Sequence, residues 1–158
     1  MKAATIHQIK KELTHKNADE LLKLCLRLGK FKKDNKELLT YLLFEADDEE
    51  AYIELMKNDI EDQLNAINSN SLYYVKKGLR KLIRNMDKGL RYSGQKETEL
   101  AVRIFLCQKI QERGIPYDSI RAFMTIYDSQ IKKIKAALSK LHEDLQYEYL
   151  EDVKGVER

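Results

Sequence analysis

Apolar side chains recur every three or four positions along most of this 158-residue chain. That spacing places them on one face of an α-helix, because a helix has about 3.6 residues per turn. Residues that interrupt helices are rare: the six glycines are scattered, and Pro116 is the one proline. Proline removes a helical hydrogen bond and glycine lowers helix propensity, so their scarcity favours long helices. The pattern therefore predicts an all-α protein.

The apolar pattern divides into six or seven helical segments with short connections. Two segments begin with a capping signal, Asn17 with Glu20 and Asp34 with Glu37, at the three-residue spacing of a capping box. The last segment either runs unbroken to about Tyr149 or breaks near residues 127–129. The segments expected to be helical cover residues 6–14, 17–28, 34–45, 47–67, 72–90, 95–113 and 118–149.

Short connections make consecutive helices pack as antiparallel hairpins. Such hairpins either stack in the manner of HEAT or armadillo repeats or form an irregular helical bundle. Charged residues make up 35% of the chain, compared with an average of about 25%, and this excess favours the thin layers of the stacked arrangement. The length suits a single domain over residues 1–158, with residues 151–158 as a frayed tail.

The predicted helix over residues 72–90 contains two glycines. Gly78 and Gly89 are each expected to weaken this helix by about 1 kcal/mol relative to alanine. Gly89 alternatively marks the end of the helix. The apolar residues between the two glycines lie on the face that we expect to be buried.

Charge is unevenly distributed along the chain, although the net charge is only +3. Residues 47–68 carry a net charge of −7, whereas residues 69–94 carry +6. Within this second block, six cations recur at helical spacing and share one face, opposite the apolar face. This basic stripe consists of Lys77, Arg80, Lys81, Arg84, Lys88 and Arg91.

Three interpretations of the basic stripe follow from its composition. It is the solvated face of a helix that lies beside the acidic helix over residues 47–62, or it binds an acidic protein. In the third interpretation it binds the phosphates of a nucleic acid, while Tyr73, Tyr74 and Tyr92 stack on bases. Further cations then contribute from Lys30, Lys32, Lys33 and Lys36. Coverage of the stripe by the acidic helix would count against nucleic-acid binding.

Motifs for catalysis or metal binding are sparse. Glu12 and His15 have the Glu-x-x-His spacing of di-iron bundles, but such sites need a second pair and the chain has none. The acidic residues 47–50 lack the alternation and the glycine of a calcium loop, and they suit the start of a helix. No phosphate-binding glycine loop or nucleophile elbow occurs. We therefore expect no enzyme activity, catalytic residue, metal, cofactor or small-molecule substrate.

The two cysteines, Cys25 and Cys107, lie among apolar residues and are expected to be reduced, buried thiols. Reduced thiols suit a cytoplasmic location. No run approaches the roughly 18 apolar residues of a membrane span, so we expect no membrane partner.

Residues 10–57 resemble an uncharacterised bacterial family of all-helical domains of unknown function. The motifs that carry this resemblance are Lys-Lys-Glu-Leu at 10–13, Asp-Glu-Leu-Leu at 19–22, Asn-Lys-Glu-Leu-Leu-Thr-Tyr-Leu-Leu-Phe at 35–44 and Asp-Asp-Glu-Glu at 47–50. The resemblance implies a helical fold and assigns no functional residue.

Residues 6–43 also resemble the SAP helical hairpin of DNA-binding proteins. The first SAP helix corresponds to Leu21, Leu24 and Leu28, and the second corresponds to residues 36–42. The glycine-containing turn of SAP is replaced here by residues 30–34. The resemblance implies a hairpin that contacts DNA.

The sequence favours a non-enzymatic helical scaffold or adaptor that binds another protein or itself. Two-faced helices, segregated charge and the lack of catalytic motifs support this hypothesis. The alternative is a nucleic-acid-binding helical protein that uses the basic stripe within residues 76–91.

Overall fold

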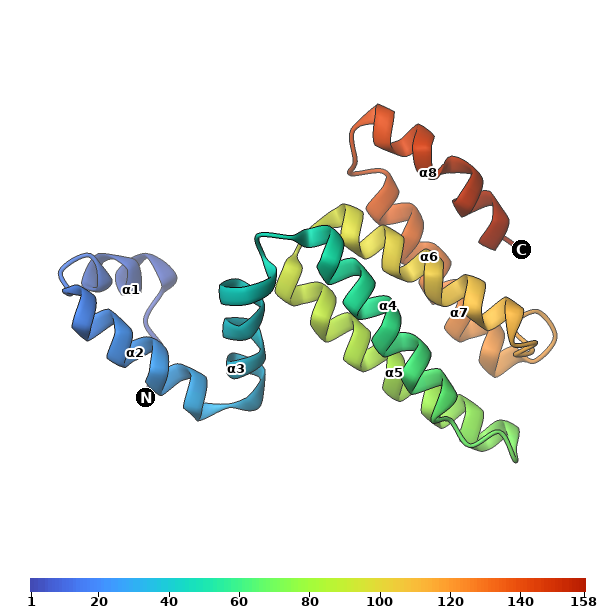
Figure 1. Ribbon diagram of the computed structural model, residues 1–158, viewed down its shortest axis with the longest axis horizontal. Helices are drawn as coiled ribbons and strands as arrows, with labels where there is room; N and C mark the ends of the chain where they lie inside the picture. Colours follow the sequence, from blue (N-terminus) through green and yellow to red (C-terminus); the bar gives the residue numbers. More distant parts are fainter. The chain divides into compact units, whose positions relative to one another are not determined.

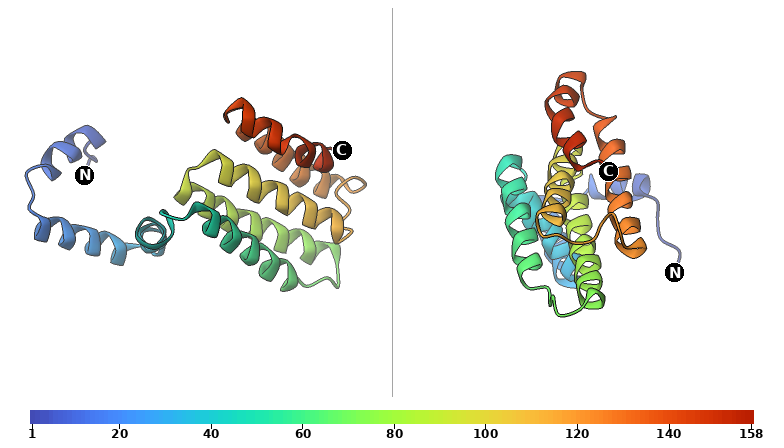
Figure 2. Two further views of the ribbon diagram at one scale, coloured as in Figure 1. Left: turned by 45° about the horizontal axis from the view of Figure 1, so that its top comes forward. Right: turned by 90° about the vertical axis from the view of Figure 1, so that its right-hand side faces the viewer.

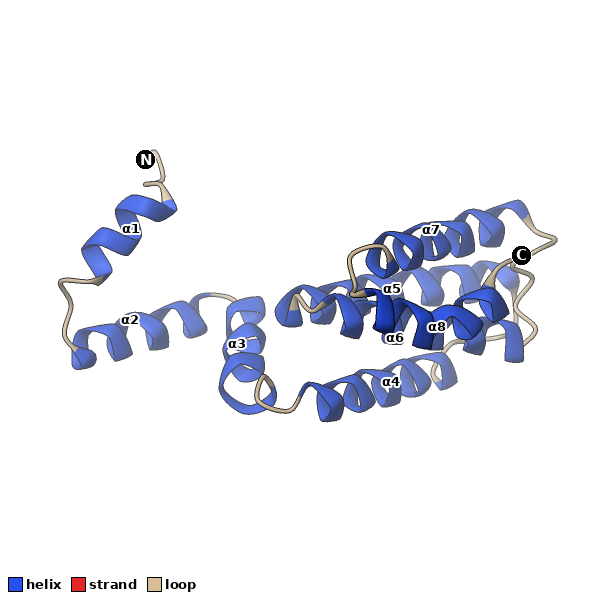
Figure 3. Ribbon diagram, turned by 90° about the horizontal axis from the view of Figure 1, so that it is seen from above, coloured by secondary structure: helices blue, strands red, loops and turns tan.

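The computed structural model describes residues 1–158, and every regular element in it is a helix (Figure 3). Helices make up 78% of the chain and no strand is present, which confirms the all-α prediction. The chain forms eight α-helices instead of six or seven, and HEAT-like stacking is not confirmed. None of these helices is long and apolar enough to cross a membrane.

The chain divides into two compact units, an N-terminal unit (Met1–Phe44) and a C-terminal unit (Glu45–Arg158). This division does not test whether the two units belong to one domain. The single domain expected over residues 1–158 therefore stays a prediction. The N-terminal unit contains α1 (Ile6–Leu13), α2 (Ala18–Phe31) and α3 (Lys33–Thr40), and a π-helical turn (Tyr41–Glu45) crosses the boundary (Figure 1). The C-terminal unit contains α4 (Glu49–Asn65), α5 (Leu72–Ser93), α6 (Lys96–Glu112), α7 (Arg121–Leu138) and α8 (Glu143–Val156).

Side-chain caps explain where the N-terminal helices begin. The side-chain oxygen of Asn17 accepts the backbone N–H of Glu20 at 2.9 Å, and the Glu20 carboxylate accepts that of Asn17 at 3.0 Å, which confirms this capping pair. The cap predicted at Asp34 is wrong, because α3 begins earlier, after an N-cap at Lys32 with extended backbone. Asp34 therefore lies in the first turn of α3, where a carboxylate still faces the positive end of the helix dipole.

α2 and α3 meet at a corner, and Gly29 of α2 lies close to α3 (Figure 1). A Cβ atom on Gly29 would lie 2.9 Å from Leu39 Cδ1, so α3 crosses α2 where the side chain is smallest. The side-chain amide of Asn35 donates to the carbonyl of Leu28 at 2.8 Å. The two helices do not build a core, because α1, α2 and α3 contain no buried residue.

α6 is the central helix of the C-terminal unit. It packs against α4, α5, α7 and α8, and the antiparallel neighbours can be followed in Figure 2. Because α6 has four neighbouring helices, eight of its residues are buried, and two of these are polar. The buried residues of α6 are Thr98, Leu100, Val102, Arg103, Ile104, Leu106, Cys107 and Ile110.

The two glycines of α5 are positions of close approach, besides weakening the helix. A Cβ atom on Gly78 would lie 2.6 Å from Ile67 Cγ1, and one on Gly89 would lie 3.2 Å from the Tyr52 hydroxyl. That hydroxyl donates to the Gly89 carbonyl at 3.0 Å. The prediction that Gly89 ends the helix is wrong: α5 ends before Gly94, whose φ of 68° is the left-handed conformation that glycine adopts readily.

The apolar pattern over residues 118–149 forms two helices. α7 ends at Leu138, and α8 begins after His142, whose Nδ1 accepts the backbone N–H of Asp144 at 3.3 Å. The predictions of one unbroken helix or of a break near residues 127–129 are therefore wrong, and this break adds the eighth helix. Residues 127–129 stay helical, with Tyr127 fully buried in the core.

The C-terminal residues pack onto the core. α8 extends to Val156, whose side chain is fully buried and whose carbonyl accepts the Tyr127 hydroxyl at 2.6 Å. The guanidinium of Arg158 lies 2.7 Å from both carboxylate oxygens of Asp128. The frayed tail expected over residues 151–158 is therefore wrong, because Val153 and Val156 complete the core.

The close approach at Gly78 predicts that Gly78→Ala destabilises the C-terminal unit. The added methyl group meets Ile67 Cγ1, which is fixed close to the backbone, so an overpacking cost of about 1–3 kcal/mol outweighs a helix-propensity gain of about 1 kcal/mol. Gly155→Ala is the matched control, since no atom lies within 4 Å of its Cβ position. Thermal unfolding followed by circular dichroism should show a lower midpoint for Gly78→Ala than for Gly155→Ala; equal midpoints would contradict the packing.

Candidate functional site

All six residues of the basic stripe lie on α5, and five of them are exposed. Lys88 is half-buried. α4 packs against α5 but leaves the stripe open to solvent. The exposed residues, none of which forms an ion pair, are Lys77, Arg80, Lys81, Arg84 and Arg91.

Glu61, an acidic residue of α4, forms ion pairs with cations outside the basic stripe. Glu61 of α4 lies 2.8 Å from Lys109 on α6 and 2.8 Å from Arg113 just beyond it. The hydrogen bond from Lys109, together with a smaller effect of the one from Arg113, lowers the pKa of Glu61 below its ordinary value. This carboxylate therefore joins α4 to α6 and does not neutralise the stripe.

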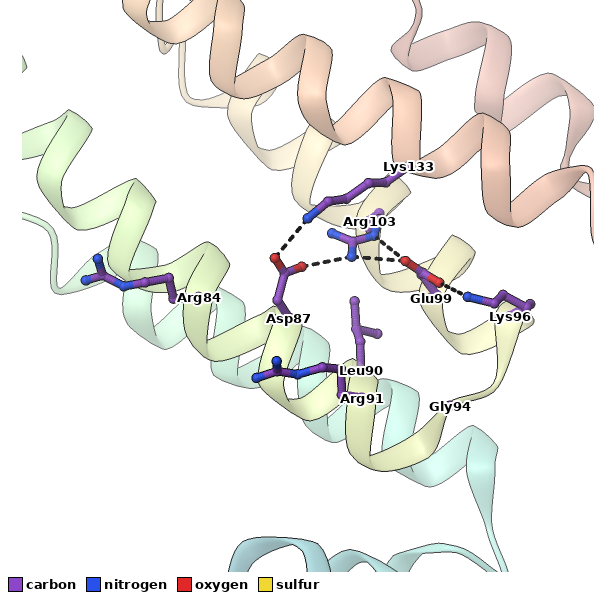
Figure 4. Close-up of a pocket in the computed structure, with 9 residues that line it drawn as sticks. All are labelled: Arg84, Asp87, Leu90, Arg91, Gly94, Lys96, Glu99, Arg103 and Lys133. Carbon is purple, nitrogen blue, oxygen red and sulfur yellow. Dashed lines mark hydrogen bonds and ion pairs between the residues drawn. The ribbon is translucent and has the colours of Figure 1, made fainter. Parts of the chain in front are cut away.

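A cleft of about 660 Å³ opens beside the stripe, with residues of α5, α6 and α7 in its walls (Figure 4). Five of the nine lining residues are cationic and two are anionic. We call this cavity the cationic cleft. Its lining residues are Arg84, Asp87, Leu90, Arg91, Gly94, Lys96, Glu99, Arg103 and Lys133.

Arg103 is the buried centre of the ionic network in the cationic cleft. Its side chain is only 4% exposed, and its Nη2 lies 2.8 Å from Asp87 and 3.0 Å from Glu99. Its Nη1 donates to the side-chain oxygen of Gln130 at 2.7 Å. Asp87 also pairs with Lys133 at 2.9 Å. The network therefore joins α5, α6 and α7, because each helix supplies at least one member.

Both carboxylates of this network are held in the ionised form. Burial raises the pKa of Asp87, but the bonds from Lys133 and Arg103 outweigh it, so its pKa lies below the ordinary 3.8. Burial likewise raises the pKa of Glu99, and Lys96 together with Arg103 brings it below the ordinary 4.5. Ionised carboxylates that already face cations are not free to neutralise other cations nearby.

Arg84 and Arg91 are the cations that the network leaves unpaired. Figure 4 shows Asp87 and Glu99 turned toward Arg103, while Arg84 and Arg91 extend from α5 without a bond to either carboxylate. The cationic cleft therefore presents unneutralised guanidinium groups on a rigid, three-helix support. Such groups bind anions, because a guanidinium donates two parallel hydrogen bonds to phosphate or carboxylate.

A second cavity extends the cationic surface along α5. It has a volume of about 390 Å³ between α5 and α7, and it shares Arg84 and Lys133 with the cationic cleft. Its lining adds the stripe residue Arg80 and contains no acidic residue. The two cavities together form one trough with a single sign of unpaired charge.

The remaining chemically reactive side chains do not converge on this trough. No group of three or more histidine, cysteine, aspartate or glutamate residues is placed to hold a metal ion. Cys107 is buried as predicted, and burial raises the pKa of its thiol to about 12. The prediction that Cys25 is buried is wrong, because α2 has no core to bury it.

The N-terminal unit offers a second candidate, an apolar surface. Thirteen of the chain's nineteen exposed large hydrophobic residues lie in residues 1–44, although this unit is the smaller one. They are Met1, Ile6, Ile9, Leu13, Leu22, Leu24, Leu26, Leu28, Phe31, Leu38, Leu42, Leu43 and Phe44. Monomeric proteins rarely expose large apolar patches, so the number of exposed apolar residues makes the N-terminal unit a candidate interaction surface.

No protein-family model, curated protein or solved structure matches the chain. The two resemblances noted over residues 10–57 and 6–43 therefore stay predictions.

Sequence reasoning found the stripe but missed the residues opposite it. Lys96, Arg103 and Lys133 lie on other helices, and only the packing of α6 and α7 brings them to α5. One signal was available for Arg103, a charged residue inside the apolar run of residues 100–107. A charge in that position requires partners, because burying it alone is costly.

The network predicts an acid-sensitive C-terminal unit. Because the folded-state pKa values of Asp87 and Glu99 are lowered, their stabilisation is fully present above the ordinary values of 3.8 and 4.5 and is lost as the pH falls through the folded-state values. Urea unfolding should therefore give a free energy that decreases below about pH 4.5. The Asp87→Asn, Glu99→Gln double variant should show a shallower decrease; a slope equal to that of the unaltered protein would contradict the assignment.

Proposed function

We propose that the protein is a non-enzymatic scaffold that associates with a second copy of itself through the N-terminal unit. The observation that carries this proposal is the row of apolar residues along α2. Leu21, Leu24, Leu28 and Phe31 follow one another at spacings of three, four and three. This is the heptad spacing of two helices that pack along a common seam.

The seam residues are available for a partner. Leu24 is 40% exposed, Leu28 58% and Phe31 75%, while Leu21 is half-buried. On a helical wheel, the centre of this seam lies about 120° from Gly29, the point where α3 approaches α2. The seam therefore faces away from α3, which leaves it uncovered.

The size of the N-terminal unit also supports association. Its 44 residues contain one buried hydrophobic residue, Tyr41, whereas the C-terminal unit contains twenty-one. Chains of this size usually need a disulfide, a metal or oligomerisation to become stable. With Cys25 as its only cysteine and no group of metal-ligating side chains, the unit depends on oligomerisation.

A second copy is the partner that fits this surface best. A two-fold pair places the same apolar seam on both sides of the contact, so each leucine of α2 gains an equally apolar neighbour. The seam spans only two heptads, and the other exposed apolar residues of α1 and α3 enlarge the interface toward the 20–30 residues that a specific contact uses on each side.

The net charge of the N-terminal unit distinguishes self-association from binding to an acidic protein. Residues 1–44 contain ten basic and five acidic residues, a net charge of +5. Two such units repel one another at low ionic strength, and salt screens this repulsion. Self-association should therefore strengthen with salt, whereas binding to an acidic protein should weaken.

Sedimentation velocity tests the proposal on the full chain. We expect a dimer whose dissociation constant rises at least about a hundredfold in the Leu24→Ser, Leu28→Ser double variant, because two buried leucines per copy are lost. Leu22→Ser, Leu26→Ser is the matched control, since these leucines are as exposed but lie off the seam. A strictly monomeric protein, or equal weakening by both variants, would contradict the proposal.

Crosslinking at Cys25 gives an independent measurement. Cys25 is exposed beside the seam and midway along α2, so two-fold pairing brings it near its counterpart in the second copy. A short bismaleimide should crosslink the dimer, and Cys25→Ser should abolish the product. Cys107 does not compete, because it is buried and its thiol pKa is about 12. Failure of Cys25 to crosslink in a dimer would place the contact elsewhere.

A further inference from the structure

We infer that the trough along α5 and α7 binds the phosphate backbone of a single-stranded nucleic acid. This site is separate from the proposed self-association, which uses the N-terminal unit alone. The juxtaposition that carries it is a line of unpaired arginines on α5 beside Lys133 of α7, with exposed tyrosines at the start of the same helix face.

The arginines are free to bind phosphate because the nearby carboxylates are already paired. Asp87 faces Arg103 and Lys133, and Glu99 faces Arg103 and Lys96. Arg80, Arg84 and Arg91 form no ion pair. Asp87 of α5 is neutralised by Arg103 of α6 and Lys133 of α7. A basic stripe that was only a solvated helix face would not need this arrangement.

The trough has the length of several nucleotides. Arg80 and Arg91 are eleven residues apart, so they lie about 16 Å from each other along the axis of α5. The two cavities between them, of about 660 and 390 Å³, share Arg84 and Lys133. An extended anion, and not a single phosphate, is therefore the ligand that reaches all three unpaired arginines.

Aromatic residues continue this line toward the start of α5. Tyr73 is 61% exposed and Tyr74 is 48% exposed, and their rings meet edge to face at 5.4 Å. Tyr73 precedes Arg80 by seven residues, which places both on the same side of the helix. Exposed tyrosines next to unpaired arginines are typical of single-strand binding, because bases stack on the rings while cations hold the backbone.

Stacking on these tyrosines requires unpaired bases, which favours a single strand over a duplex. An acidic protein would use the arginines but gain nothing from stacking. A membrane surface would use the charges but would favour apolar residues around them, and the exposed residues beside the trough are polar, such as Thr125 and Ser129 of its α7 wall.

Fluorescence anisotropy with a labelled twelve-nucleotide oligouridine or oligothymidine tests the inference on the full chain. Phosphate contacts by the three unpaired arginines predict a slope of log K against log salt near −2. Arg84→Glu, Arg91→Glu should weaken binding at least about tenfold at low salt and bring the slope closer to zero by more than one. Lys140→Glu, Lys154→Glu is the charge-matched control on exposed cations of the segment after α7 and of α8, outside the trough, and should bind as the unaltered protein does.

Tyr73→Leu separates stacking from charge. It should weaken binding about tenfold and leave the salt slope unchanged. Circular dichroism of each variant should match that of the unaltered protein. The inference would be overturned if the Arg84→Glu, Arg91→Glu double variant bound as tightly as the Lys140→Glu, Lys154→Glu control. Tighter binding to polyglutamate or phosphatidylserine vesicles than to the oligonucleotides would also overturn it. Neither outcome bears on self-association, which sedimentation measures without any nucleic acid.

Discussion

The packing of α6 among four other helices is the constraint on which the C-terminal unit depends. A polar side chain on the buried part of such a helix has no water to bind, so it must find partners within the protein. Arg103 meets this requirement through Asp87, Glu99 and Gln130, and these contacts join α5, α6 and α7. The same contacts occupy the carboxylates beside the basic stripe. Packing of the core thus determines which surface charges remain unpaired.

The two units differ in how many of their apolar residues they bury. The C-terminal unit buries its apolar residues among five helices, and even its last turn contributes Val153 and Val156. The N-terminal unit has only three short helices, and most of its leucines are exposed. This difference supports the proposal that the C-terminal unit is stable by itself and that the N-terminal unit contacts a second copy.

Periodicity was sufficient to predict the helices and the basic stripe, because both depend on local spacing. It could not predict what depends on packing. The sequence marks Gly78 only as a residue that weakens α5, whereas its close approach to Ile67 follows from the packing. The break between Leu138 and His142 has no strong local signal, since the apolar spacing continues through it. Arg103 and Lys133 lie far from the stripe in sequence, so their place in the cationic cleft follows only from the fold.

The central claim is that α2 completes its packing with the α2 of a second copy. Amide hydrogen exchange at low and high protein concentration tests this claim most directly, because protection of an interface helix depends on association whereas protection of a core helix does not. We predict that protection of residues 18–31 rises with concentration while that of α6 stays constant. Protection of α2 that is independent of concentration would contradict the account.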